Sequence, residues 1–226
     1  REATGLDLAL SADAASARRR LTDGRTAAAA RRVAELPGRD TAFVGRDPER
    51  AEVAELLARP GPALTTLLGP PGVGKTRLAL EIAREQRALG AFPDGAHLID
   101  LGSIEDAAAL PSRVAAALGA DEAPSDDAAL EQVAARLAGA DALLLLDNAE
   151  HLASASAVFA RLAAACPDAT LLVTSRERLG LEAERVYPLR GLAYPDRDDV
   201  PLDEALAFGA VELFVRRAER VAPSFE

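Results

Sequence analysis

Eight consecutive residues have the types and the spacing of a phosphate-binding loop. They are Gly69, Pro70, Pro71, Gly72, Val73, Gly74, Lys75 and Thr76, which stand between an apolar stretch and an amphipathic one. Glycines let the backbone curl until its N–H groups converge on a polyphosphate, and the following helix adds its positive N-terminal end. Lys75 would then reach the β and γ phosphates, and Thr76 would hold Mg²⁺. The pattern predicts a P-loop.

The lysine of this loop is unusual within the chain. Lys75 is the only lysine, so every other residue among the 26 Lys and Arg is arginine. An ammonium is a compact point charge on a flexible stem, which suits a phosphate. The alternative interpretation is a glycine-rich turn between a strand and a helix that binds no ligand.

A carboxylate follows the most apolar run of the chain. Residues 142–146 have no polar alternation, which is typical of a strand buried on both faces, and Asp147 comes next. Ligands of open α/β sheets bind beyond the carboxyl ends of the strands. Asp147 could therefore hold Mg²⁺ directly or through water. Alternatively, it only caps the helix that follows.

Two further charged residues are expected at the same edge. Arg176 ends the next strand and could sense a γ phosphate through charge-assisted hydrogen bonds, or it could form a surface ion pair with Glu177 or Glu182. Hydrolysis needs a group that orients the attacking water. Because an amide, Asn148, follows Asp147, that role would pass to Glu150, which could equally be a helix-start carboxylate without catalytic duty. The sequence therefore does not favour fast turnover.

The elements that must position these residues alternate along the chain. We expect strands over residues 63–68, 96–101, 142–146, 170–174 and 185–189, and helices over 48–58, 76–89, a pair around 110–118, 125–139, 151–165 and about 211–218. This alternation predicts an α/β fold with a mostly parallel sheet and helices on both faces. The segment from 192 to about 206 is loop-like.

Local signals support several of these boundaries. We expect Asp47 to cap the first of these helices, with Pro48 as its first residue. Leu89 has the spacing to face the sheet, and Ser125 has the type and position of another helix cap.

Composition limits the remaining possibilities. The net charge of −10 argues against a general nucleic-acid surface, and no apolar run approaches the roughly 20 residues of a membrane span. One cysteine, Cys166, fits a reducing cytosol, and its spacing from neighbouring apolar residues favours a buried hydrophobe over a reactive thiol. We therefore expect a cytoplasmic protein with no membrane partner.

Residues 1–36 form a weakly apolar, Arg-rich helical pattern. Their arginines could suggest DNA contacts, but interspersed acids leave little net charge. We expect a helical linker or the remnant of a preceding domain, which ends at Pro37 and Gly38. The absence of methionine and an end just after a helix suggest a piece of a longer protein.

Four motifs occur in a characteristic order. They are Phe43-Val44-Gly45-Arg46, the loop from Gly69 to Thr76, Asp147-Asn148-Ala149-Glu150-His151-Leu152, and Leu172 to Gly180. Together they resemble the nucleotide-binding domain of STAND-class, AP-ATPase or NB-ARC-like regulators, as carried by bacterial SARP and LuxR-type transcriptional activators. The resemblance covers about residues 41–222. It implies a P-loop NTPase fold over residues 37–226, with strand order 5-1-4-3-2, truncated before helical and winged-helix parts.

The resemblance also implies roles for individual residues. Val44, Gly45 and Arg46 would lie near the adenine and ribose, Asp147 would be the acid of the second ATPase motif, and Arg176 the sensor. The predicted nucleotide-binding set is Val44, Gly45, Arg46, Gly69, Pro70, Gly72, Val73, Gly74, Lys75, Thr76 and Arg77. The predicted catalytic set is Lys75, Asp147, Glu150 and Arg176, with Thr76 and Asp147 as metal ligands.

The function implied is an ATP- or ADP-binding switch with slow ATPase activity that uses Mg²⁺. Members of this class self-associate with ATP, and DNA binding would come only through domains absent from this chain. Two alternatives belong to other classes. One is an AAA-like motor ATPase with steady turnover, and the other is a protein-interaction scaffold that binds no nucleotide.

Overall fold

The computed structural model describes residues 36–37, 43–59, 64–152, 154–197 and 199–222. All of them belong to one compact unit spanning residues 34–226. The predicted N-terminal helical segment lies outside the described residues except for Leu36, and its role as a linker or remnant stays a prediction.

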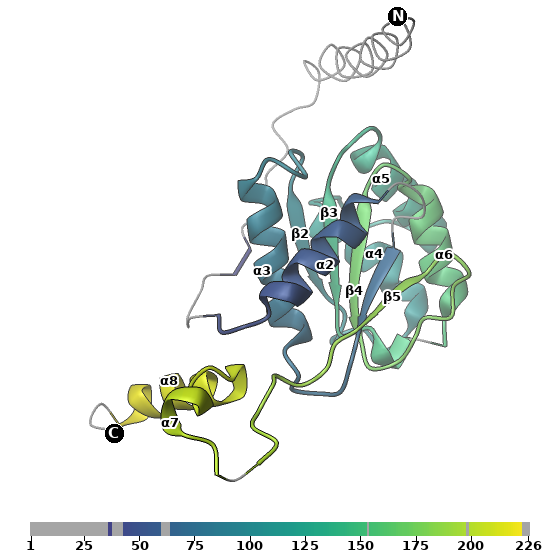
Figure 1. Cartoon of the computed structure of the whole chain (residues 1–226). Helices are drawn as coiled ribbons and strands as arrows, with labels where there is room; N and C mark the ends of the chain where they lie inside the picture. The colour runs from purple at the N-terminus through teal and green to yellow at the C-terminus, as the bar shows by residue number, and fades with distance from the viewer. Residues whose placement is uncertain (1–35, 38–42, 60–63, 153, 198, 223–226) are drawn as a thin grey trace, which may run out of the picture. The chain divides into compact units, whose positions relative to one another are not determined.

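A five-stranded parallel sheet forms the centre of this unit (Figure 1). The strands are β1 (Leu64–Leu68), β2 (Ala96–Asp100), β3 (Leu143–Asp147), β4 (Thr170–Ser175) and β5 (Arg185–Pro188). Their spatial order is β2-β3-β4-β1-β5, which confirms the predicted α/β P-loop fold and its strand order. Every residue of β3 is buried, as its apolar run predicts.

The register of the sheet brings the carboxyl ends of the strands together. Asp100 on β2 pairs with Asp147 on β3, and Leu68 on β1 pairs with Ser175 on β4. Because all the strands are parallel, the residues that follow them emerge at one edge. The loop after β1, Asp147 and Arg176 therefore share that edge.

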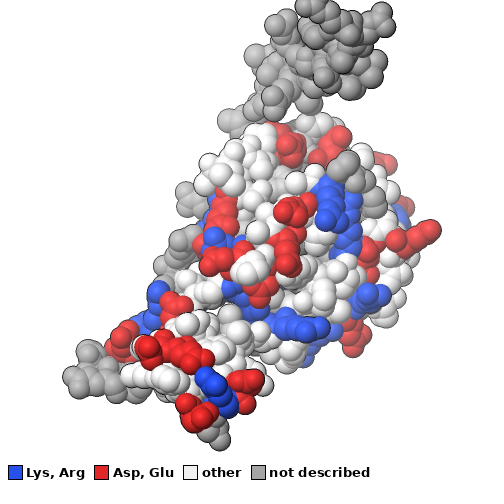
Figure 2. All heavy atoms as spheres, viewed as in Figure 1, with Lys and Arg blue, Asp and Glu red and all other residues white. Residues whose placement is uncertain are grey.

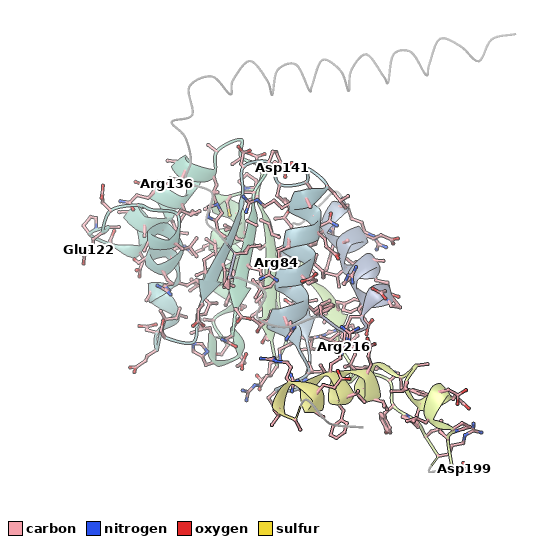
Figure 3. All side chains as sticks on the ribbon, turned by 90° about the vertical axis from the view of Figure 1, so that its left-hand side faces the viewer. Arg84, Glu122, Arg136, Asp141, Asp199 and Arg216 are labelled. Carbon is pink, nitrogen blue, oxygen red and sulfur yellow. The ribbon has the colours of Figure 1, made fainter. Side chains whose placement is uncertain are left out.

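Two helices cover one face of the sheet. They are α2 (Asp47–Ala58) and α3 (Lys75–Ala88), and their apolar side chains share a core with Leu67 and Leu145 of the strands. Arg84 of α3, labelled in Figure 3, lies on this side of the molecule. Val53 contributes to the same core and is fully buried.

Three helices cover the opposite face. They are α4 (Leu110–Ala117), α5 (Asp126–Leu137) and α6 (Ser156–Ala165), and they enclose Phe159 together with Leu144 and other strand residues. A short 3₁₀ turn, Ala107–Ala109, precedes α4. Pro111 stands in the first turn of α4, where the backbone N–H that proline lacks would have no partner within the helix.

The structure confirms one of the predicted helix caps and contradicts another. The predicted cap of α5 is confirmed, because the Ser125 hydroxyl accepts a hydrogen bond from the Ala128 N–H at 3.2 Å. The predicted cap Asp47 is wrong: Arg46, in the left-handed conformation, precedes the helix, and Asp47 accepts a hydrogen bond from Arg50 instead. The prediction that Leu89 faces the sheet is also wrong, because Leu89 follows the last turn of α3 and is 79% exposed.

The chain after β3 and β5 is more broken than predicted. The single helix expected over residues 151–165 is a 3₁₀ turn, Glu150–Leu152, followed by α6. A short helix, α7 (Leu202–Ala205), lies within the segment predicted as a loop. The last helix, α8 (Gly209–Val221), is present as predicted, but none of its residues is fully buried.

The surface of this unit carries charges of both signs. Figure 2 shows acidic and basic side chains interspersed over the face in view. Among the described residues, no helix is long and apolar enough to cross a membrane.

The cysteine is buried, as predicted. Cys166 is 1% exposed, and its thiol donates a hydrogen bond to the Leu162 carbonyl at 3.0 Å. Burial raises the pKa of the Cys166 thiol to about 11, which keeps it protonated and unreactive at neutral pH.

Replacing Leu78 with alanine should lower the free energy of unfolding by about 2–5 kcal/mol. Leu78 lies on the buried side of α3 and is 1% exposed, so the loss of its side chain leaves a cavity. Urea unfolding followed by circular dichroism measures the change. The matched control is Leu89→Ala at the end of the same helix, which should change the stability by less than about 0.5 kcal/mol. Equal losses in the two variants would contradict the packing described for α3.

Candidate nucleotide-binding site

The predicted P-loop connects β1 to α3, and its positions require glycine for two different reasons. Gly72 and Gly74 have φ angles of 74° and 99°, which a residue with a Cβ rarely adopts. At Gly69 the reason is packing, because a Cβ there would lie 2.7 Å from the Leu189 carbonyl oxygen. The loop is therefore shaped by two backbone turns and one close approach to the chain after β5.

Lys75 is held inside this loop. Its ammonium donates hydrogen bonds to the carbonyls of Gly69 at 2.8 Å and Pro70 at 3.1 Å. Burial lowers the pKa of Lys75, Arg176 acts in the same direction, and the carboxylates of Glu150 and Asp147 oppose the shift. The chain's single ammonium and three predicted catalytic residues thus lie close enough to affect one another.

A chain of hydrogen bonds fixes Asp147 between three elements. Its Oδ1 accepts from the Thr76 hydroxyl on α3 at 2.7 Å and from the Thr174 hydroxyl on β4 at 2.5 Å. The Thr174 oxygen in turn accepts from the Asn148 N–H at 3.1 Å. Asp147 is only 7% exposed. These contacts tie the Asp147 carboxylate to α3 and β4, and its role as a metal ligand stays a prediction.

The residue after Asp147 turns away from the loop. Asn148 has a φ of 65°, and its side-chain amide donates to Asp100 Oδ1 at 3.2 Å. The Gly102 N–H donates to the same oxygen, and these two hydrogen bonds hold the pKa of Asp100 below its usual value. Asn148 therefore ties β3 to the end of β2.

Glu150 and Arg176 form an ion pair. Arg176 Nε lies 2.8 Å from Glu150 Oε1, so the partner is neither Glu177 nor Glu182. The other carboxylate oxygen of Glu150, Oε2, is buried and has no hydrogen-bond partner. The arginine side chain is about half exposed, whereas the glutamate is mostly covered. The structure thus joins the predicted sensor to the predicted water-orienting residue.

The segment Val44–Arg46 lies against the P-loop. Arg46 is buried, and its guanidinium donates to the Val73 carbonyl at 3.2 Å and pairs with Glu49 at 2.6 Å. Gly45 and Arg46 both have positive φ angles, so the chain turns sharply before α2. This turn brings a segment some 30 residues earlier in the sequence beside the loop.

The oxygens of Thr76 and Asp147 suit a hard cation such as Mg²⁺. They lie side by side next to the loop, and a hydroxyl with a carboxylate is a donor set that Mg²⁺ accepts. No cluster of three or more His, Cys, Asp or Glu side chains that could hold a metal occurs in the described part of the chain.

Sequence reasoning missed two residues of this site. Thr174 and Asp100 make the hydrogen bonds that fix Asp147 and Asn148. The available signal was their polarity, since each occurs near the end of an otherwise apolar strand. His151, whose role the sequence left open, lies with its Nε2 2.8 Å from the Ile104 carbonyl oxygen.

Comparison with known families adds a coarse assignment to this geometry. A family model described as an AAA domain matches residues 59–176, which is just over half of the chain. The match includes the P-loop, β3 with Asp147, and Arg176.

Curated relatives are bacterial proteins that are much longer than this chain. A Mycobacterium tuberculosis protein named "Putative HTH-type transcriptional regulator" is 34% identical over 163 residues, which cover 72% of this chain and 17% of that protein. An uncharacterized protein of the same species is 36% identical over 189 residues, covering 82% and 43%. The regulatory protein AfsR of Streptomyces coelicolor is 32% identical over 213 residues, covering 88% and 20%. The chain therefore spans less than half the length of each.

Two solved structures are similar at lower identity. The ORC1 protein of Aeropyrum pernix, in complex with DNA, has a TM-score of 0.49 and 20% identity, covering 73% of this chain and 49% of that one. A signal transduction ATPase with numerous domains (STAND) from Pyrococcus horikoshii has a TM-score of 0.45 and 18% identity, covering 84% and 27%.

Thr174→Val should lower the free energy of unfolding by about 1–3 kcal/mol, because it removes one of the two hydrogen bonds to the buried Asp147 carboxylate and leaves the Asn148 N–H without its partner. Urea unfolding measures this loss. Thr66→Val on β1 is the matched control, since the Thr66 hydroxyl is buried without a hydrogen-bond partner and its replacement should be neutral or stabilising. A Thr66 variant as unstable as the Thr174 variant would show that the hydroxyl of Thr174 has no special role.

Proposed function

Because the chain belongs to the AAA domain family, we propose that residues 37–226 act as an ATP- or ADP-binding switch of the STAND or NB-ARC type, with slow ATPase activity. The observation that carries this proposal is the cluster around the P-loop, where the Thr76–Asp147 hydrogen bond and the Arg176–Glu150 ion pair stand beside Lys75. Loop, carboxylate and arginine correspond to the parts that bind phosphate, metal and a terminal phosphoryl group.

Bound nucleotide would engage this cluster through the residues of the loop. The backbone N–H groups from Gly72 to Thr76 and the Lys75 ammonium would hold the phosphates. Thr76 and Asp147 would hold Mg²⁺, which neutralises phosphate charge when it is bound. Val44, Gly45, Arg46 and Arg77 complete the proposed set at the other end of the nucleotide.

The Arg176–Glu150 ion pair supplies a physical basis for distinguishing ATP from ADP. A γ phosphate carries more negative charge than the carboxylate and offers several acceptor oxygens, so it would compete with Glu150 for the guanidinium. ADP lacks this group and would leave the ion pair in place. A ligand can shift a switch only through such contacts that differ between two states.

The same contacts favour slow turnover over a motor. The position after Asp147 is Asn148, an amide engaged with Asp100, and the carboxylate of Glu150 is engaged with Arg176. In this arrangement the Asn148 amide holds Asp100, one oxygen of Glu150 holds Arg176, and the other oxygen of Glu150 is buried. We expect a turnover below about one per minute, whereas typical enzymes turn over near ten per second.

The output of the switch is proposed from the relatives. Proteins named as transcriptional regulators contain a similar segment as a small part of their length. We propose that this domain is part of a cytoplasmic SARP or LuxR-type regulator, that it self-associates with ATP, and that DNA is bound by other domains. Size-exclusion chromatography with ATP and with ADP tests the self-association.

Lys75→Ala should weaken ATP binding by about 100-fold or more, because it removes the only ammonium at the predicted phosphate site. Isothermal titration calorimetry with Mg·ATP and Mg·ADP gives the affinities. Arg161→Ala on α6, whose guanidinium pairs with Asp127, is a control that should bind both nucleotides as the wild type does. Negligible heats in all three proteins would instead favour a scaffold that binds no nucleotide.

Arg176→Ala should narrow the difference between ATP and ADP affinity by about 10- to 100-fold and leave ADP binding largely intact, since only the γ phosphate would meet the guanidinium. The same calorimetry measures both ligands. Glu150→Gln is the complementary variant, which should widen the difference because Arg176 loses its competing carboxylate. Equal weakening of ATP and ADP in the Arg176 variant would exclude the sensor role.

A further inference from the structure

A cavity of about 760 Å³ lies between α8 and the start of the nucleotide-binding unit. Val44 and Arg77 line it on one side, and Leu213, Arg217, Arg220 and Val221 of α8 line it on the other. Small-molecule sites typically have volumes in the range of roughly 300–1,000 Å³ and combine apolar walls with a few polar groups. The volume of this cavity lies in that range, and its described lining combines three apolar residues, Val44, Leu213 and Val221, with five charged ones.

The cavity adjoins the P-loop without including its phosphate-binding residues. Arg77 directly follows Thr76 on α3, and Val44 stands two residues before Arg46, whose guanidinium donates to the Val73 carbonyl. Phosphates held by the loop would therefore leave the remaining part of a nucleotide, its ribose and base, to extend toward this space.

The start of α8 is packed against the segment that carries Val44. A Cβ at Gly45 would lie 3.4 Å from Leu192 Cδ2 and 3.9 Å from the Gly209 Cα, and the Ala210 N–H donates to the Ala193 carbonyl at 3.0 Å. These contacts place the first turn of α8 beside Gly45. The rest of the helix then forms the second wall of the cavity.

The arginines of this wall differ in their partners. Arg216, labelled on α8 in Figure 3, pairs with Glu212 at 2.6 Å. The guanidinium groups of Arg217 and Arg220 make no ion pair or hydrogen bond with another described residue. A guanidinium plane stacks well on an aromatic ring, and a purine offers such a ring. Glu219 is the one acid among the described residues that line the cavity.

We propose that Arg217 and Arg220 of α8 pack on the base and ribose end of the bound nucleotide, opposite Val44. This inference rests on the proposed nucleotide switch. It assigns recognition of the base and ribose to α8 and recognition of the γ phosphate to Arg176. The α8 arginines would respond to ATP and ADP alike, because the two share their base and ribose, whereas Arg176 would respond to the γ phosphate. Occupancy of the site, rather than the identity of the nucleotide, would then fix the position of α8.

The double variant Arg217→Ala, Arg220→Ala tests this division. Its affinities for Mg·ATP and Mg·ADP should both fall by about tenfold, to the same extent, because two cation–π contacts are lost. Its affinity for pyrophosphate, which has no base, should not change. Calorimetry with the three ligands measures these values, and Arg161→Ala again serves as the surface-arginine control. Since α8 buries no residue fully, the double variant should keep the thermal unfolding midpoint of the wild type without ligand.

The possible outcomes separate this inference from the proposed function. If the wild type binds ATP and depends on Lys75 but the double variant binds as tightly, α8 does not contact the nucleotide and the switch proposal stands. If pyrophosphate affinity falls together with the nucleotides, the arginines hold phosphate and the proposed contact with the base is wrong. If the wild type binds no nucleotide, both proposals fail.

A second measurement uses the absence of tryptophan from the chain. Val221→Trp places a single reporter at the cavity, and Phe214→Trp places one on the same helix at a position that does not line it. Saturating ADP should protect the first tryptophan from quenching by acrylamide and leave the second unchanged. Equal quenching of the first reporter with and without ADP would contradict the proposal.

Discussion

The arrangement of this site depends on one buried carboxylate. Asp147 accepts hydrogen bonds from Thr76 on α3 and Thr174 on β4, so a single side chain joins the helix after the P-loop to the two central strands. Burying a carboxylate that is only 7% exposed is costly unless it accepts hydrogen bonds. Here two hydroxyls donate to one of its oxygens. The P-loop, the sheet edge and the candidate metal ligands are thus fixed relative to one another by one set of contacts.

The polar and charged groups beside this carboxylate already bind other protein groups, which a ligand would have to displace. Lys75 holds two loop carbonyls, Arg176 holds Glu150, and Asn148 holds Asp100. Each group that would act on a phosphate or on water already has a protein partner, so a ligand must exchange one interaction for another. Such exchanges suit a switch better than a rapid catalyst, because their energy depends on which phosphates the ligand carries.

The segment before α2 and the last helix, α8, both lie near the P-loop. Arg46 brings the segment before α2 to the P-loop, and Gly45 lets the start of α8 approach it closely. The last helix therefore stands over a cavity formed with residues near the N-terminal end of the nucleotide-binding unit. An element with no fully buried residue can move at a lower cost than the helices that enclose the core.

Much of the fold followed from the sequence for local reasons. The glycine spacing around Lys75, the apolar run before Asp147 and the alternation of strands and helices predicted the P-loop, the buried strand and the α/β class, because each depends on neighbours in the chain. The exact strand order came from the resemblance to a family, and the structure confirmed it. The misassigned cap at Asp47 and the exposed Leu89 show the limit of local rules, since a left-handed residue before α2 and the end of α3 decided those positions.

Only the tertiary structure decided which charges meet. Sequence placed Glu150 and Arg176 at strand ends but offered Glu177 and Glu182 as the arginine's partners, and it assigned no role in the site to Thr174 or Asp100. The reason is that these contacts join different strands, whose register is set by packing of the whole sheet on two layers of helices. The sequence by itself determined that a phosphate-binding loop stands before a helix in a parallel α/β domain. The packing of the sheet determined how that loop is joined to Asp147 and to the Glu150–Arg176 pair.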